Sequence, residues 1–391
     1  MIDSKLVEFV EKDFCSVVKD LTSGNPKIGS KDYLTEGRFP IIDQGSNFCS
    51  GYTNSKELLC NIELPCIIFG DHTRVLKYVD TPFALGADGV KVLKPIKGLS
   101  EKYLFYFLKN LDIPSAGYSR HFKFLKENNI KYPLQLSEQK RIVSILDKAD
   151  GIRQKREQAI KLADDFLRAT FLDMFGDPVE NPKKLKKSPI TELADIITGF
   201  AFKSNDYVGD SSESVRLCRG ANTLTGYLDW ADTKFWPKNK LEKLDNYLIK
   251  AGDIILAMDR PWISNGLKVC IFPESQRETY LVQRVARLRP RSESYVNYIY
   301  SCIKSPAFEN HCCPTETTVP HISPVELKNF EVLIPPDKLM DKFHSIASTI
   351  NNSLNKMASG DISSDALLSK LSQQAFQDIL RGKYIWTYLT C

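Results

Sequence analysis

Several polar side chains that can donate hydrogen bonds stand in turns directly after apolar, strand-like runs. The segment LAMDRPWISNGLKV places Arg260 just beyond the run AGDIIL, in a turn rich in Pro and Gly. The segment RLCRGANTLTG places Arg219 and Asn222 after another such run. Guanidinium and carboxamide groups hydrogen-bond to base edges, and cations bind phosphates, so these turns are candidate nucleic-acid contacts. The alternative for Arg260 is a surface salt bridge with Asp259.

A corresponding turn occurs in the first half of the chain. FGDHTRV places His72, Thr73 and Arg74 after the apolar run LPCIIFG, and we treat them as contacts of the same kind. Asp71 and His72 are also the only compact pair of an acid and an imidazole that we find for hydrolysis. An enzyme with an unrecognised hydrolytic site therefore stays open as an alternative, and it predicts turnover by the isolated chain.

Two further polar segments precede long helical stretches. AGYSRHFKFLKENN mixes cations with aromatic residues, and TTVPHIS stands at the matching point of the second half. Their candidate contacts are Arg120, His121, Lys123, Thr317, Thr318 and His321. The alternative is that each segment is only a capping turn.

The motifs of several enzymes are missing from the sequence. It holds no GxxxxGK[ST] phosphate loop, no HExxH, and no glycine-rich cofactor loop with Asn or Asp before Pro-Pro and an aromatic residue. The ten cysteines form no matched CxxC pairs, and His311-Cys312-Cys313 lacks the usual zinc spacing. We therefore expect reduced thiols, no metal, no cofactor and a non-catalytic chain.

Composition sets broad limits on the class of protein. The 391 residues suffice for two or three domains, and 42% hydrophobic with 26% charged residues excludes wholesale disorder. The start MIDSKLVEFVEKDF lacks the order of a signal peptide and no run is long and apolar enough to span a membrane, so we expect a cytoplasmic protein. The net charge of +5 is not concentrated in a basic arm, so charge alone leaves nucleic-acid binding open.

Residues 136–178 predict one helix, ended by Gly176 and Pro178. Its residues recur at spacings of three and four in a heptad seam, which predicts packing against another helix. The seam consists of Ile142, Ile145, Ala149, Ile152, Arg156, Ala159, Ala163, Phe166 and Thr170. Further apolar residues widen the stripe, which predicts a second covered surface. With Arg156, the expected partner-binding residues are Leu146, Ile160, Leu167, Phe171 and Met174.

The chain repeats itself. A second helical stripe begins at residue 336 and is interrupted by MASGDISSDA, so we expect a C-terminal helix over 336–384 that breaks near residue 360. GSKDY matches KSNDY, DQGSN matches CRGAN, VKVLKP matches VARLRP, and SEKY at 100–103 matches SESY at 292–295. These landmarks keep one order, so the sequence predicts a tandem duplication of domain plus helix. Two such helices pair most simply antiparallel, which would place two unlike domains at the ends of a spacer that measures a distance, as DNA-binding dimers do.

The segments that carry a family resemblance are YPLQLSEQKRIVSIL, FLRATFLDMFGDP, TGFAFKSNDY and AGDIIL. The chain closely resembles the specificity subunits of type I restriction-modification enzymes. The resemblance implies an α+β protein with two mixed α/β target-recognition domains, separated by a long antiparallel two-helix coiled coil in a pseudo-twofold arrangement. The expected domains are residues 1–135 and 179–335, the helical regions 136–178 and 336–384, and the tail 385–391.

The resemblance also implies partners. Each domain would read one half of a split sequence in double-stranded DNA, with the turns described above facing the DNA. The helices would dock adenine methyltransferase subunits, two in number, and restriction subunits that translocate DNA would join the full complex. The lead YPLQL is shorter than most family members have, and Leu339-Met340 stands where the first copy has Glu138-Gln139, so docking at the second helix is in doubt. A non-enzymatic coiled-coil adaptor that binds protein or glycan remains the alternative from another class.

Overall fold

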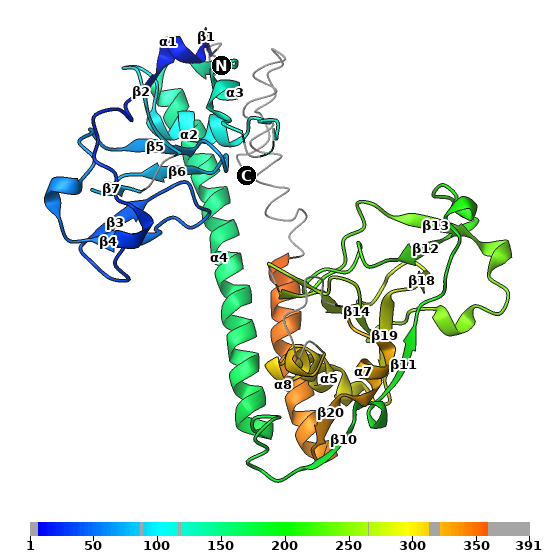
Figure 1. Cartoon of the computed structure of the whole chain (residues 1–391). Coiled ribbons are helices and arrows are strands. Elements are labelled where there is room, and N and C mark those ends of the chain that lie inside the picture. The colour runs from blue at the N-terminus through cyan, green and yellow to red at the C-terminus, as the bar shows by residue number, and fades with distance from the viewer. Residues whose placement is uncertain are drawn as a thin grey trace, which may run out of the picture. The chain divides into compact units, whose positions relative to one another are not determined.

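The computed structural model describes residues 7–86, 89–115, 117, 119–264, 266–312 and 321–358. The chain divides into two compact units, the first Met1–Glu157 together with Ala358–Cys391, and the second Gln158–Met357. Each unit contains helices and strands, so the α+β class is confirmed (Figure 1).

The first unit is built on a four-stranded antiparallel sheet of order β2-β8-β5-β6. A second sheet has the order β4-β3-β7, with β3 and β7 parallel, and β1 pairs with β9. The strands are β1 (Phe9–Asp13), β2 (Val18–Asp20), β3 (Phe39–Ile42), β4 (Gly51–Thr53), β5 (Cys66–Gly70), β6 (Leu76–Val79), β7 (Ala84–Leu85), β8 (Val90–Pro95) and β9 (Asn129–Pro133). All five residues of β5 are buried, as expected for a continuous apolar run between covered faces.

Helices cover the four-stranded sheet of the first unit. They are α1 (Phe14–Val17), α2 (Glu101–Lys109), α3 (Phe122–Lys126) and the first part of α4 (Leu136–Phe175). The helix α2 begins at Ser100, whose hydroxyl accepts a hydrogen bond from the backbone N–H of Tyr103. The buried side chains of α2 pack with Ile67 and Phe69 of β5 in one core. The sequence YLFYFL thus forms a core helix.

The second unit repeats this arrangement. Its sheets have the orders β11-β19-β14-β17 and β13-β12-β18, with β12 and β18 parallel, and β10 pairs with β20. The strands are β10 (Lys186–Pro189), β11 (Ala194–Thr198), β12 (Ser214–Cys218), β13 (Lys234–Pro237), β14 (Ile254–Ala257), β15 (Trp262–Ile263), β16 (Gly266–Leu267), β17 (Val269–Ile271), β18 (Thr279–Leu281), β19 (Val285–Pro290) and β20 (Glu331–Ile334). The short pair β15 and β16 is an insertion between β14 and β17, where the first unit has a tight turn.

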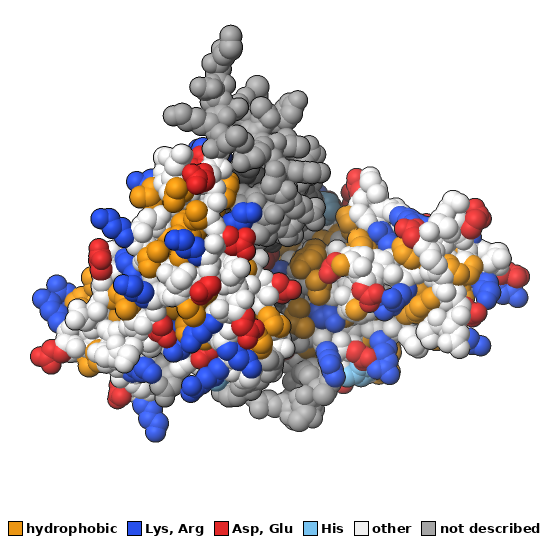
Figure 2. Space-filling model, turned by 90° about the horizontal axis from the view of Figure 1, so that it is seen from above, with side chains coloured by type: hydrophobic (Ala, Val, Ile, Leu, Met, Phe, Trp, Pro, Cys, Tyr) orange, Lys and Arg blue, Asp and Glu red, His pale blue; other side chains and the backbone are white. Residues whose placement is uncertain are grey.

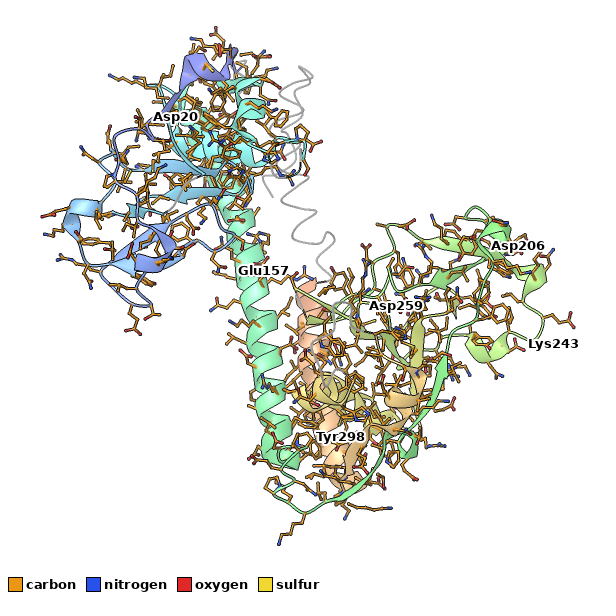
Figure 3. All side chains as sticks on the ribbon, viewed as in Figure 1. Asp20, Glu157, Asp206, Lys243, Asp259 and Tyr298 are labelled. Carbon is orange, nitrogen blue, oxygen red and sulfur yellow. The ribbon has the colours of Figure 1, made fainter. Side chains whose placement is uncertain are left out.

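The helices of the second unit form its core together with the end of α4. They are α5 (Val296–Ile303), α6 (Pro306–Cys312), α7 (Pro324–Asn329) and α8 (Asp337–Ala358). The rings of Phe171 and Phe175 on α4 contact Tyr298 on α5 and Phe343 on α8, with centroids 4.7 to 5.9 Å apart. The end of α4 therefore lies beside the start of α8 within this unit (Figures 1 and 3).

Two arginines of β19 form ion pairs within the second unit. Arg289 bonds both carboxylate oxygens of Asp253, with Nε–Oδ1 at 2.8 Å and Nη2–Oδ2 at 2.7 Å. Arg287 is buried and lies 2.8 Å from Asp195. Burial lowers the pKa of Arg287, whereas the hydrogen bond with Asp253 raises that of Arg289. These cations are structural, because they bond carboxylates and backbone carbonyls of their own unit.

The long helix is one uninterrupted element. α4 ends at Phe175, and Gly176 follows in the left-handed conformation with φ of 83°. The boundary between the two compact units falls inside α4, between Glu157 and Gln158, so each unit includes one part of the helix. The predicted break near residue 360 and the tail 385–391 lie outside the described residues.

The buried face of α4 differs from the predicted seam. Ile152 and Phe166 belong to that seam but are 56% and 55% exposed, whereas Leu146, Phe171 and Met174 beside it are buried. Each end of the helix packs on the sheet and helices of its own unit, so the buried stripe follows those cores and not a heptad line.

Candidate nucleic-acid interface

A groove of about 1060 Å³ opens in the second unit. Three of the segments that line it are the turn after β14, the turn before β19 and the residues before α7. The groove is lined by Thr198, Gly199, Gly220, Ala221, Met258, Asp259, Arg260, Lys268, Gln283, Arg284, His321 and Pro324. Backbone hydrogen bonds hold the segments together, because Met258 donates to the carbonyl of Arg284 at 2.9 Å and accepts from Ile322 at 2.9 Å.

Asp259 joins two of the lining side chains. Its Oδ1 lies 2.6 Å from Nδ1 of His321, and its Oδ2 accepts a hydrogen bond from Nη1 of Arg284. Burial alone would raise the pKa of Asp259, but the bonds from Arg284 and His321 lower it. The carboxylate is therefore ionised near neutral pH and has both oxygens occupied.

Arg260 does not form the salt bridge with Asp259 that was its alternative. Asp259 is engaged by Arg284 and His321, and Arg260 makes no ion pair with any residue that the structure describes. Its side chain is exposed at the groove, on a residue with φ of 44°. The Arg260 guanidinium is thus available to an external acceptor.

The groove carries an excess of positive charge. Arg260, Lys268 and Arg284 line it, and Asp259 is the single carboxylate among its lining residues, all of which the structure describes. Burial lowers the pKa of Lys268, and the nearby Asp259 opposes that effect. Elsewhere the charges are mixed: Figure 2 shows Lys and Arg interspersed with Asp and Glu over the visible surface of each unit. The groove therefore differs from its surroundings in suiting a polyanion.

Arg219 and Asn222 have internal roles. Arg219 pairs with Asp232 at 2.8 Å. Asn222 is 1% exposed, and its amide bonds the carbonyls of Asp229 and Asp232 and the N–H of Arg219. Asn222 is therefore placed to shape the loop rather than to touch a ligand. The loop contributes Gly220 and Ala221 to the groove instead.

The matching region of the first unit is the turn between β5 and β6. Gly70 and Val75 close the turn through backbone hydrogen bonds, and Thr73 Oγ1 donates to the carbonyl of Gln44 at 2.5 Å. Arg74 has φ of 63° and donates from Nη1 to the carbonyl of Ile113 at 2.9 Å. His72 is partly buried, and its backbone N–H donates to the side chain of Gln44. Thr73 and Arg74 are the exposed members of this turn.

Asp71 and His121 form a structural link in the first unit. His121 is 1% exposed, and its ring Nδ1 lies 3.0 Å from the carbonyl oxygen of Asp71. The backbone N–H of His121 donates to the same oxygen at 2.7 Å. The Asp71 carboxylate is buried and accepts a bond from the N–H of Phe122 at 2.7 Å. His121 is therefore not a surface group here, and Asp71 fixes backbone rather than facing a substrate. Arg120 and Lys123 are exposed.

Arg120 and His321 occupy the same place in the two units. The N–H of His121 bonds the carbonyl of Asp71 just after β5, and the N–H of Ile322 bonds the carbonyl of Met258 just after β14. The residue before each of these donors is Arg120 in one unit and His321 in the other. Thr317 and Thr318 lie outside the described residues.

Lys268, Gln283 and Arg284 are groove residues that the sequence analysis did not single out. Gln283 and Arg284 stand directly before the matched strand VARLRP, between two buried apolar runs. That position predicts a turn, which the positive φ of Arg284 confirms. Polar residues in such a turn could therefore have been predicted as groove residues beside Arg260.

The predicted partner-binding residues separate into two groups. Leu146, Phe171 and Met174 are buried in the cores of their own units. Arg156 and Leu167 are partly exposed. The large exposed apolar residues on α4 are instead Ile152, Ile160, Leu162, Phe166 and Leu172.

Neither a metal site nor a membrane span emerges from the described part of the chain. Among the described residues, no three His, Cys, Asp or Glu side chains gather as metal ligands. His311 bonds the carbonyl of Glu326, and Cys312 is buried. Over the same residues, every helix is too short or too polar to cross a bilayer.

Comparisons with known proteins agree with this arrangement. Residues 7–162 match the family described as Type I restriction modification DNA specificity domain. The Type I restriction enzyme EcoAI specificity subunit of Escherichia coli is 29% identical over 180 residues, which are 44% of this chain and 30% of that protein. The Type I restriction enzyme MjaVIII specificity subunit of Methanocaldococcus jannaschii is 27% identical over 273 residues, 64% of this chain and 63% of that protein. The chain thus spans less than two thirds of the length of either relative.

One solved structure extends the likeness in fold to the whole chain. The crystal structure of a Type-I restriction-modification system S subunit from M. genitalium has a TM-score of 0.59 and 14% identity, covering 99% of each chain. Residues 7–162 are thus similar to a type I restriction-modification DNA specificity domain, and the whole chain shares its fold with a solved S subunit.

Proposed function

We propose that this protein is the DNA sequence-specificity subunit of a type I restriction-modification system and itself catalyses no reaction. The observation that carries the proposal is the groove of the second unit, where Arg260, Lys268 and Arg284 face a single carboxylate. Guanidinium groups in loops can pair with base edges and phosphates of double-stranded DNA. Arg260 has the greatest freedom to do so, because no described residue pairs with it.

Two recognition domains, residues 1–135 and 179–335, would each read one half of a split target. The repeated sheet orders of the two units support a tandem duplication. The shared place of Arg120 and His321 supports a common DNA-facing edge. The different side chains at that place, and the insertion of β15 and β16 in the second unit only, suit two different target sequences.

The helical regions 136–178 and 336–384 would form an antiparallel coiled coil that sets the gap between the half-sites. Contacts of Phe171 and Phe175 with Phe343 support a pairing of the two helices near the end of α4. The unbroken course of α4 from Leu136 to Phe175 suits a stiff spacer.

Adenine methyltransferase subunits, two in number, would dock on the helices, and restriction subunits would complete the assembly. The exposed apolar residues of α4 support a docking surface formed by Ile160, Leu162 and Phe166 with the partly exposed Arg156 and Leu167. This surface revises the expected one, because Leu146, Phe171 and Met174 are already buried.

The test is binding and methylation by the chain assembled with modification subunits. We expect adenine methylation at one split sequence, weak DNA binding by the chain alone, and a logarithmic salt dependence of several units from phosphate contacts. Equal methylation of all DNA would show that specificity resides elsewhere. A chain that binds a protein or glycan ligand and ignores DNA at low salt would favour the adaptor.

A further inference from the structure

Asp259 is an acidic residue in the centre of a groove that otherwise suits a polyanion. Its carboxylate faces the DNA phosphates that the proposed function brings to the groove, so it repels DNA of any sequence. It lies in the middle of the second unit, beside β14, while Asp206 lies toward the far end of the same unit (Figure 3). An acid in this place has no evident benefit for affinity.

Asp259 instead holds the side chains of Arg284 and His321 in fixed positions. Arg284 comes from the turn before β19 and His321 from the segment before α7, and Asp259 bonds both from the turn after β14. Their side chains are 69% and 53% exposed, so little packing restrains them. A free arginine side chain loses rotamer entropy when it is fixed, and a carboxylate that holds it beforehand removes much of that loss on binding.

The fold itself depends little on this carboxylate. Exposed ion pairs contribute little to stability, and the backbone contacts between the three segments do not involve the Asp259 side chain. A change at this carboxylate should therefore act on binding more than on stability.

We propose that Asp259 is a positioning residue for specificity: it fixes Arg284 and His321 for the second half-site and weakens attraction to all other DNA. This inference rests on the proposed function. It assigns to one carboxylate two effects of opposite sign, which a purely structural role would not produce.

The experiment uses the full chain assembled with modification subunits. Binding is measured against DNA with both half-sites intact, with the second altered, with the first altered, and with both altered, at several salt concentrations. For Asp259→Ala we expect binding to the doubly altered DNA to strengthen about 5- to 10-fold, with a salt slope steeper by about one unit, because Arg284 is freed for a phosphate. Discrimination at the second half-site should fall at least 10-fold, while discrimination at the first stays unchanged.

Three further variants separate the causes. Asp259→Asn keeps the shape of the side chain, and its non-specific binding and its half-site discrimination should lie between those of the wild type and of Asp259→Ala. This variant keeps the test valid if Asp259→Ala folds poorly. The double variant Asp259→Ala, Arg284→Ala should lose the gain in non-specific binding, because the freed cation is gone. Asp206→Ala removes an equal charge from an exposed pair with Lys240 in the same unit and should leave both readouts unchanged.

Each outcome decides something. If Asp259→Ala weakened binding to all four DNAs by the same factor, or if Asp206→Ala had an equal effect, the role of Asp259 would be overturned and the proposed function would stay intact. A wild-type complex without preference for any split sequence would overturn the proposed function and this inference with it.

Discussion

The side-chain oxygen of Gln139 accepts a hydrogen bond from the backbone N–H of Ser100 at 2.7 Å. Its amide nitrogen donates to the carbonyls of Gly98 at 2.9 Å and Pro133 at 2.8 Å, and the side chain is fully buried. One residue in the first turn of α4 therefore ties that helix to the start of α2 and the end of β9.

Replacement of Gln139 by Leu should lower the free energy of unfolding by about 2 to 4 kcal/mol, because it leaves buried donor and acceptor groups of the backbone unpaired. Denaturation in urea measures the loss. The control is Gln154→Leu on the exposed part of the same helix, where Gln154 bonds Asp150, and it should change stability by less than about 0.5 kcal/mol. Similar losses in the two variants would contradict the link.

Replacement of Arg260 by Ala should weaken binding at the second half-site by about 1 to 3 kcal/mol if the guanidinium reads a base. Titration of the complex against DNA altered at either half-site measures the loss. Lys243 is a matched control, since it is also an exposed cation with positive φ, 66° against 44°, and lies away from the groove (Figure 3). An equal loss on every sequence would make Arg260 a phosphate contact only.

The phenylalanines of α4 should respond to truncation in opposite ways. Phe175→Ala removes a buried ring that contacts Tyr298 and Phe343, and it should destabilise the protein by about 3 to 5 kcal/mol. Phe166→Ala should leave the unfolding free energy nearly unchanged, because its ring is exposed, and should weaken association with modification subunits. Calorimetry and co-purification measure the two effects, and unchanged association would remove Phe166 from the docking surface.

Shortening α4 should change the gap between half-sites. Removal of residues 155–161 shortens a helix by about 10 Å and changes its rotation by only about 20°. That length corresponds to about three base pairs at 3.4 Å each. Methylation of DNA libraries with varied gaps measures the outcome, and each half-site should still be read. An unchanged gap would exclude the helix as the spacer.

The cysteines should differ sharply in reactivity. Burial raises the pKa of Cys66, Cys218 and Cys302 to about 12, so at pH 8 these thiols stay protonated and inaccessible. Cys15 is exposed. Alkylation of the native protein followed by mass spectrometry should label Cys15 before unfolding and the three buried thiols only after unfolding. Early labelling of Cys218 would indicate that the second unit opens locally.

The matched landmarks of the sequence do not give every correspondence between residues of the two units. SEKY and SESY match by letters with Tyr103 opposite Tyr295, whereas the structure gives Tyr103 and Tyr298 the same role. The hydroxyl of Tyr103 donates to the carbonyl of Lys131, and that of Tyr298 to the carbonyl of Leu333, in the last strand of each unit. A short match can slip by three residues because such a shift along a helix keeps roughly the same face.

The divergence at Gln139 was visible in the sequence, but its meaning was not. The matching residue of the second copy, Met340, is buried in an apolar core. One copy thus anchors its helix through three hydrogen bonds and the other through packing. Only the surroundings reveal that both anchor the helix, since polar and apolar residues have opposite preferences for burial.

Residue type alone could not separate contacts on the surface from internal supports. His121 and Asn222 have suitable donors, but both are buried and bond backbone carbonyls, His121 that of Asp71 after β5 and Asn222 those of its own loop. Arg260 was predicted with the same reasoning and is exposed at the groove. The difference arises from which carbonyls the folded loops bring within reach, which depends on contacts between segments far apart in the sequence.

Arg74, Arg260 and Arg284 all stand in the left-handed region of backbone conformation. Glycine would adopt that geometry with less strain, by roughly 1 kcal/mol at each position. Selection for thermal stability alone would therefore favour replacement of these arginines. Variants with glycine at these positions should have a higher melting temperature, but they lose the positive charge. At these turns, thermal stability and ligand discrimination thus favour different residues. In random libraries selected only for thermal stability, arginine should become less frequent at all three positions.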